Sequence, residues 1–189
     1  GKVTLIGAGL LGHALALVRA TEPLLLDLVE LGRLEAAAAW ARRGLADAQV
    51  IPGLERERVG ILRAAALVAR KRGEYALAEQ RLREGMRVLG ELGDGPTLLA
   101  ELQTELARLH VGRREAGPAV EAGRAAVALL EADYGSMSGP AAAALVNLGR
   151  MSAGVGRDAD AIGALQEALE RYRDVPAPLY EPLALALLG

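Results

Sequence analysis

Cysteine is absent from this sequence of 189 residues, and histidine occurs only twice, as His13 and His110. The lack of cysteine excludes disulfides, thiolate metal sites and cysteine nucleophiles. The two histidines lie far apart in the chain, so a histidine-based metal site is not expected either. We therefore predict that the chain holds no metal and no cofactor.

Aromatic residues are almost as scarce, at 3% of the chain, with no phenylalanine and a single tryptophan, Trp40. A platform that stacks nucleic-acid bases needs exposed rings, and the chain has too few of them. Hydrophobic residues nevertheless make up 52% of the sequence. The core must therefore consist of leucine, alanine and valine. Because leucine and alanine are strong helix formers, this composition favours closely packed helices.

An excess of either charge is also missing, since 22 basic residues stand against 24 acidic ones and the net charge is −2. The chain has no field that would attract nucleic acid, so no direct nucleic-acid partner is predicted. Pairs such as Glu79 with Arg83 and Glu167 with Arg171 are typical of solvated helix faces. Metalloprotease, Walker A, nucleophile-elbow and EF-hand spacings are lacking, and we predict that the chain is not an enzyme.

Residues 142–171 carry the most regular pattern, two apolar helical stripes separated by Gly156. The first stripe comprises Leu145, Leu148 and Ser152, and the second comprises Ala161, Leu165, Ala168 and Leu169. Together they predict a helix-turn-helix unit. One such unit cannot bury both of its faces, so neighbouring units are expected.

Similar turns recur along the chain, each a glycine followed by arginine or glutamate and then a helical stretch with small residues. We take the turn glycines to be Gly32, Gly73, Gly112 and Gly156, which are separated by 41, 39 and 44 residues. A period of this size predicts an all-α solenoid of antiparallel helix pairs.

The last pair resembles the tetratricopeptide repeat, whose pattern is W-x2-L-G-x2-Y followed by A-x3-F. The matching residues are Leu145, Leu148, Gly149, Gly156, Ala161, Leu165 and Ala168. The period and the link ADYGSMSGPAAAALVNLG are similar to long-repeat members, namely kinesin light chain-like arrays and the sensor regions of bacterial transcription regulators. The resemblance implies a non-catalytic, cytoplasmic scaffold or adaptor that binds a protein or peptide, such as the regulatory array of a bacterial regulator.

We predict one domain over residues 1–189, with about four repeats and incomplete ends. Thr21 is expected to cap the first helix of repeat 1, with Pro23 in its first turn. The predicted parts are a partial repeat at 1–20, repeats at 21–50, 54–93, 96–134 and 138–174, and a terminal helix at 177–189.

The N-terminal segment allows a different interpretation. Gly7, Gly9 and Gly12 form G-x-G-x-x-G after a strand-like KVTLI, and Asp27 ends a second apolar run. This resembles the opening of a dinucleotide-binding Rossmann unit and would imply an NAD-binding enzyme domain. However, Asp27 lies only 15 residues after Gly12, and nothing downstream alternates strand with helix. We favour a glycine-containing helix at residues 5–20 that packs as the second helix of an incomplete repeat. The apolar run at residues 3–18 is too short to span a membrane.

Candidate ligand contacts follow from the tetratricopeptide resemblance, because the first helix of each pair lines the concave surface in such arrays. The residues implied are Arg63, Arg70, Lys71, Gln103, His110, Asn147 and Arg150. Asn147 corresponds to the asparagine of carboxylate-clamp repeats. Basic and amide groups of this kind favour an acidic peptide or a C-terminal carboxylate. The alternative is that each is an ordinary solvated residue.

The last stretch of the chain carries an apolar stripe with almost no charge, at Leu179, Leu183, Leu187 and Leu188. An exposed apolar surface usually marks an interface. We therefore expect this helix to meet another chain or further residues of its own protein, with a two-fold homodimer as the favoured outcome.

Overall fold

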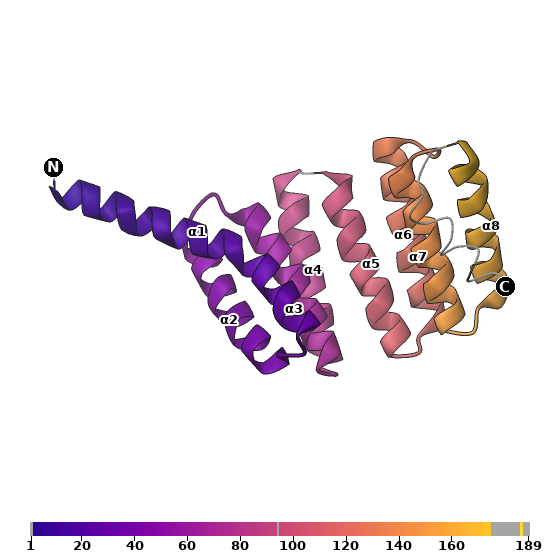
Figure 1. Ribbon diagram of the computed structural model, residues 1–189, viewed down its shortest axis with the longest axis horizontal. Helices are drawn as coiled ribbons and strands as arrows, with labels where there is room; N and C mark the ends of the chain where they lie inside the picture. The colour runs from indigo at the N-terminus through magenta and orange to yellow at the C-terminus, as the bar shows by residue number, and fades with distance from the viewer. Residues whose placement is uncertain (1, 94, 175–185, 187–189) are drawn as a thin grey trace. The chain divides into compact units, whose positions relative to one another are not determined.

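The computed structural model describes residues 2–93, 95–174 and 186 of the chain, and every regular element in that part is an α-helix (Figure 1). The helices are α1 (Lys2–Glu30), α2 (Leu34–Val50), α3 (Glu55–Lys71), α4 (Tyr75–Leu92), α5 (Pro96–Gly112), α6 (Ala116–Tyr134), α7 (Gly139–Gly154) and α8 (Asp158–Asp174). The predicted all-α class is thus confirmed. The terminal stripe at Leu179, Leu183, Leu187 and Leu188 lies outside the described residues.

The chain divides into two compact units, residues 1–94 with α1–α4 and residues 95–189 with α5–α8. In the first unit, α1 packs against both α2 and α3, and α3 packs against α4. In the second unit, α5 packs against α6, α6 against α7, and α7 against α8. Each unit therefore contains two helix pairs. The continuous array over residues 1–189 stays a prediction.

A hydrogen-bonded turn of one kind joins the helices within every pair. One residue adopts positive φ, and the next residue donates its backbone N–H to the carbonyl five positions earlier, which is the Schellman motif. The positive-φ residues are Gly32, Gly73, Arg114 and Gly156. The corresponding bonds are Arg33 to Leu28 at 2.8 Å, Glu74 to Ala69 at 2.8 Å, Glu115 to His110 at 2.9 Å and Arg157 to Ser152 at 2.9 Å.

The third turn does not lie at Gly112, where the sequence analysis placed it. Gly112 is the last residue of α5, and Arg114 takes the positive-φ position, with φ of 60°. The turns are therefore 41, 41 and 42 residues apart rather than 41, 39 and 44. The sequence was misread because glycine served as the marker of the turn, whereas the backbone hydrogen bonds of the motif hold an arginine in the same conformation.

Replacing Arg114 with glycine is expected to stabilise the protein. A left-handed backbone costs an ordinary L-residue roughly 1–2 kcal/mol, and glycine adopts it freely. The Arg114 side chain is exposed, so the substitution removes little packing. Denaturant unfolding should show a rise of about 1 kcal/mol in the free energy of unfolding of Arg114→Gly.

The equivalent Gly73, with φ of 79°, provides the matched control. Gly73→Ala should lower the free energy of unfolding, because there the substitution introduces the strain that Arg114→Gly removes. A destabilised Arg114→Gly would contradict this account of the turn.

The first helix also differs from the prediction. Residues Thr21 and Pro23 lie inside α1, which runs unbroken from Lys2 to Glu30. Thr21 is not an N-cap: it is 2% exposed, and its hydroxyl donates to the carbonyl of Leu17 at 2.9 Å. The reason is the buried stripe of α1, which continues at helical spacing across the proline, at Val18, Thr21, Leu25 and Leu28.

The predicted stripes of the last pair form the core of the second unit. Leu145, Leu148 and Ser152 of α7 are buried, as are Ala161, Leu165 and Ala168 of α8, whereas Leu169 is partly buried against this core. Gly149 lies at their contact, where an added Cβ would lie 2.6 Å from Leu165 Cγ and 3.3 Å from the Ala161 carbonyl oxygen. The absence of a side chain at Gly149 therefore sets how closely α7 and α8 approach.

Candidate functional site

The four turns give the pairs a common numbering. We call the helix before each turn the A helix, namely the second half of α1, α3, α5 and α7, and the helix after it the B helix, namely α2, α4, α6 and α8. The two A helices of each unit contact one another, α1 with α3 and α5 with α7. All seven candidate contact residues lie on A helices.

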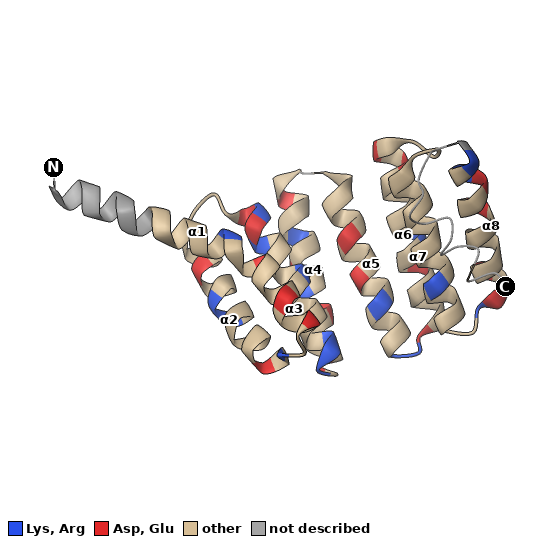
Figure 2. Cartoon of the chain, in the orientation of Figure 1, with Lys and Arg blue, Asp and Glu red and all other residues tan. Residues whose placement is uncertain are grey.

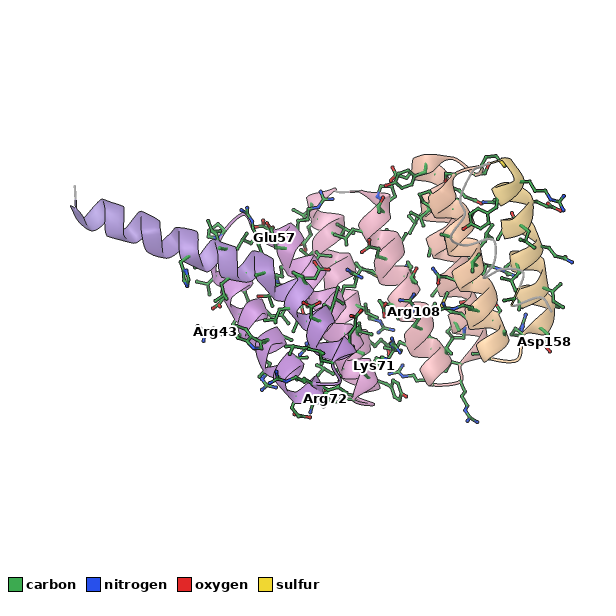
Figure 3. The ribbon with its side chains drawn as sticks, viewed as in Figure 1. Arg43, Glu57, Lys71, Arg72, Arg108 and Asp158 are labelled. Atoms are coloured by element: carbon green, nitrogen blue, oxygen red, sulfur yellow. The ribbon has the colours of Figure 1, made fainter. Side chains whose placement is uncertain are left out.

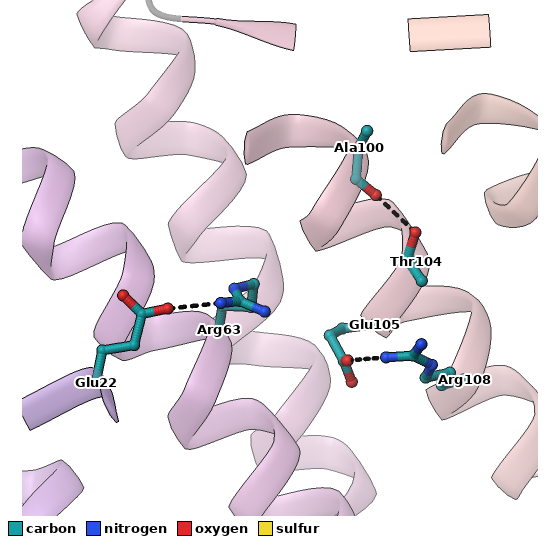
Figure 4. Close-up of polar contacts among 6 residues, drawn as sticks. All are labelled: Glu22, Arg63, Ala100, Thr104, Glu105 and Arg108. Carbon is teal, nitrogen blue, oxygen red and sulfur yellow. Dashed lines mark hydrogen bonds and ion pairs between the residues drawn. The ribbon is translucent and has the colours of Figure 1, made fainter. Parts of the chain in front are cut away.

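In the first unit, Arg63 and Glu22 join the two A helices. Arg63 Nη2 lies 2.6 Å from Glu22 Oε1, and both side chains are partly buried (Figure 4). The Glu22 carboxylate occupies the space that a Cβ at Gly60 would need. The charge of Arg63 is therefore neutralised within the protein. Of the other two candidates on α3, Arg70 is half-buried, and Lys71 is exposed at the end of the helix (Figure 3).

Two candidates on α5 lie where other pairs bury residues. Gln103 lies eleven positions before the turn residue Arg114. The equivalent residue before Gly73 is Leu62, which is buried. His110 precedes Arg114 by four positions. Its Nδ1 lies 2.6 Å from Glu115 Oε2, and its side chain is 13% exposed. The structure thus places Gln103 and His110 partly inside the third helix pair.

Asn147 and Arg150 lie nine and six positions before the turn residue Gly156. Asn147 is half-buried and Arg150 is exposed. Glu105 and Arg108 occupy the same two positions on α5, counted from Arg114. Glu105 is 5% exposed, and its carboxylate pairs with Arg108 Nη1 (Figure 4).

Glu105 and Arg108 were not among the residues predicted from the sequence, which placed the third turn at Gly112 instead of Arg114. A usable signal was present, since a buried alanine follows each turn residue by five positions. These alanines are Ala37, Ala78, Ala119 and Ala161. Their spacing alone predicts the correct positions on α5.

A hollow of about 300 Å³ lies between α7 and α8. Its lining includes the exposed Arg150, the acidic Asp158 and the apolar Ile162, which is 48% exposed. An exposed isoleucine beside an arginine offers a partner both an apolar contact and a hydrogen-bond donor. Of the seven candidate residues, Arg150 lines this hollow, and Asn147 lies three residues before it on α7.

Charges of both signs alternate over the helices of each unit (Figure 2). Many are paired along one helix, as Glu79 is with Arg83 at 2.5 Å. Arg171 was predicted to lie on a solvated helix face, but it is buried, with 9% of its surface exposed. It pairs with both Glu131 and Glu167. Burial opposes the charge of Arg171, but its hydrogen bonds to Glu131 and Glu167 raise its pKa above the usual value, so it stays charged.

The dinucleotide-binding interpretation has no support in the structure. Gly7, Gly9 and Gly12 lie within α1, and Asp27 is exposed on the same helix. A Rossmann fingerprint requires a strand, a tight turn and then a helix. Within the described residues, no helix is long and apolar enough to cross a membrane, and no group of three or more His, Asp or Glu residues could hold a metal ion.

The helix pairs, their turns and the small residues between them define a tetratricopeptide-like repeat fold. The structure is similar to BtubC (BKLC) from P. vanneervenii, with a TM-score of 0.74 and 20% identity, covering 91% of this chain and 72% of that one. It is also similar to a putative kinesin light chain from Podosopora anserina with nearly identical TPR-like repeats, with a TM-score of 0.71 and 18% identity, covering 90% and 81%. No protein-family model and no curated protein matches the sequence.

Proposed function

We propose that this chain is a non-catalytic scaffold or adaptor that binds a protein or peptide segment in the cytoplasm. The tetratricopeptide-like fold fits a scaffold or adaptor module. The observation that carries the proposal is the hollow between α7 and α8, with the exposed Arg150 on its wall and Ile162 beside it. Helix faces that offer exposed arginine and apolar groups suit extended peptide ligands.

The preferred ligand is an acidic segment or a C-terminal carboxylate. A guanidinium can form two parallel hydrogen bonds with a carboxylate, and such charge-assisted bonds are stronger than neutral ones. In the second unit, Arg150 and the amide of Asn147 supply the donors. In the first unit, the exposed Lys71 and the half-buried Arg70 lie at the end of α3.

Selection from a random peptide library on the purified chain tests this proposal, because it should enrich sequences with Asp, Glu or a free C-terminus. Arg150→Glu should weaken binding of an enriched peptide by about 1 kcal/mol or more, roughly fivefold in Kd, and reduce its salt dependence. Arg70→Glu should have the same effect on a ligand that reaches the first unit. Titrations at two salt concentrations measure both quantities.

Arg43→Glu serves as the matched control, because Arg43 is exposed on the B helix α2 and the change in charge is identical. Its affinity should be close to that of the parent chain. Enrichment of basic or purely apolar peptides, or equal losses in the Arg43 and Arg150 variants, would contradict the proposal.

A further inference from the structure

Each unit has a hollow between its two B helices, floored by the A helix between them. The hollow between α2 and α4 measures about 250 Å³, and that between α6 and α8 about 390 Å³. Both carry an arginine ten positions after a turn residue, Arg42 after Gly32 and Arg124 after Arg114. The two hollows are therefore equivalent places in the repeat, and their differences can be compared position by position.

In the second unit, the protein itself supplies the carboxylate that faces this arginine. Arg124 Nη2 donates to Asp160 Oδ1 at 2.8 Å, so the pair spans from α6 to α8. Asp160 lies four positions after the turn residue Gly156. The same position after Gly73 is Leu77, which lines the hollow of the first unit. Arg42 consequently faces leucine where Arg124 faces aspartate.

The hollow of the first unit lacks the equivalent of Asp160 and contains a second arginine instead. Arg81 of α4 lines the α2–α4 hollow at the position equivalent to Ala164 in the second unit. Neither Arg42 nor Arg81 has an ion-pair partner within 4.0 Å among residues 2–93 and 95–174. Arg72, at the rim, is already bonded to Glu74 at 3.0 Å and to Glu35 at 3.2 Å.

Arginines outnumber carboxylates in the lining of the α2–α4 hollow. The lining contains three arginines, Arg42, Arg72 and Arg81, and one glutamate, Glu74. Burial lowers the pKa of Arg81. Glu74 and Glu84 oppose that effect, and the neighbouring Arg42 adds to it, so that the net change is downward. Two guanidinium groups placed together without an anion are less stable than the same groups around a carboxylate.

We propose that the α2–α4 hollow is a second binding site, which takes the side-chain carboxylate of a glutamate or aspartate from a partner protein. The guanidinium groups of Arg42 and Arg81 would hold the carboxylate oxygens, as Arg124 holds Asp160. Ala65 and Val68 of α3 give the hollow an apolar floor that suits the methylene groups of a glutamate. The site lies on the B helices and does not depend on the A-helix surface proposed above.

Titration of the full chain with a short capped peptide, one glutamate flanked by alanines, tests the site. The readout is the NMR signal of each arginine Nε–H group. The signals of Arg42 and Arg81 should shift saturably, whereas that of Arg124, already bonded to Asp160, should not. The same peptide with glutamine in place of glutamate should leave all three signals unchanged.

Leu77→Asp is the decisive variant, because it places in the first unit the carboxylate that the second unit already has. The internal aspartate should occupy Arg42 and reduce peptide affinity by about tenfold or more. Leu77 is only partly buried, and circular dichroism would verify that the helices are retained. Arg42→Ala should produce the same loss of affinity without altering the hollow's apolar floor.

Arg43→Ala, one residue away on the exposed side of α2, removes the same charge and should leave peptide affinity unchanged (Figure 3). The Nε–H signals of Arg42 and Arg81 separate this site from the A-helix surface, because they report on the two arginines of the hollow directly. Equal binding of the glutamine peptide, or full affinity in Leu77→Asp, would overturn the proposal. Binding of inorganic phosphate without binding of the glutamate peptide would overturn it as well, because the site would then prefer a different anion.

Discussion

Gly149→Ala is expected to destabilise the second unit by about 2 kcal/mol. Alanine is normally the better helix former by up to about 1 kcal/mol, but here its Cβ would lie 2.6 Å from Leu165 Cγ and 3.3 Å from the carbonyl oxygen of Ala161. The Leu165 side chain can rotate away only within a packed core, and the backbone of α8 can move only with its neighbours. The steric cost therefore exceeds the gain in helix propensity.

Gly163 of α8 supplies the matched control, since a Cβ there would meet nothing within 4 Å. Gly163→Ala should raise the free energy of unfolding by about 0.5–1 kcal/mol through helix propensity alone. Denaturant unfolding followed by circular dichroism measures both variants. If Gly149→Ala were as stable as Gly163→Ala, the close approach of α7 and α8 would be wrong.

Arg171→Ala is expected to cost about 3 kcal/mol. Arg171 is buried and pairs with Glu131 of α6 at 2.6 Å and with Glu167 on its own helix. Removing it leaves the partly buried Glu131 without its cation and removes the link between the two B helices. Since the raised pKa of Arg171 keeps it charged throughout the physiological range, the loss should be similar from pH 6 to pH 9.

Arg173→Ala is the appropriate comparison, because Arg173 lies two residues away on the same helix and is exposed. Its effect should stay within about 0.5 kcal/mol. A double variant, Arg171→Met with Glu131→Leu, should recover much of the stability lost in Arg171→Ala, because apolar groups of similar size can replace a buried ion pair at little cost. Failure to recover any stability would contradict this account, because the apolar pair restores the volume and leaves no unpaired charge on residue 131.

The sequence predicted the second helix pair most accurately. The turn glycine expected in this pair, Gly73, lies between α3 and α4 and has positive φ, and Ile61, Leu62 and Ala65 of α3 are buried. Here the apolar period, the glycine at the turn and the linkers indicate the same boundaries. Where local signals conflict with packing, as at Thr21 and Pro23 in α1, the continuous buried stripe prevails.

The candidate site was predictable only as far as the positions of the turns were known. Asn147 and Arg150 follow from a pair whose turn has the expected glycine, Gly156. On α5 the turn lies two residues later than expected, and the equivalent residues there, Glu105 and Arg108, were not identified. The hollow between α2 and α4 depends on side chains from three helices, and no local pattern in the sequence reports that combination.

The Schellman turns also indicate where the chain could be lengthened by design. Within each pair, backbone hydrogen bonds fix the connection around the positive-φ turn residue. An insertion there would rotate one helix against the other. Between α6 and α7, in contrast, the chain passes through the exposed Gly135, Ser136 and Met137 before Ser138 caps α7 through the N–H of Ala141. A peptide tag or a whole reporter domain inserted after Ser136 would leave both flanking pairs intact, which makes this loop the natural attachment point for a fluorescent or affinity label.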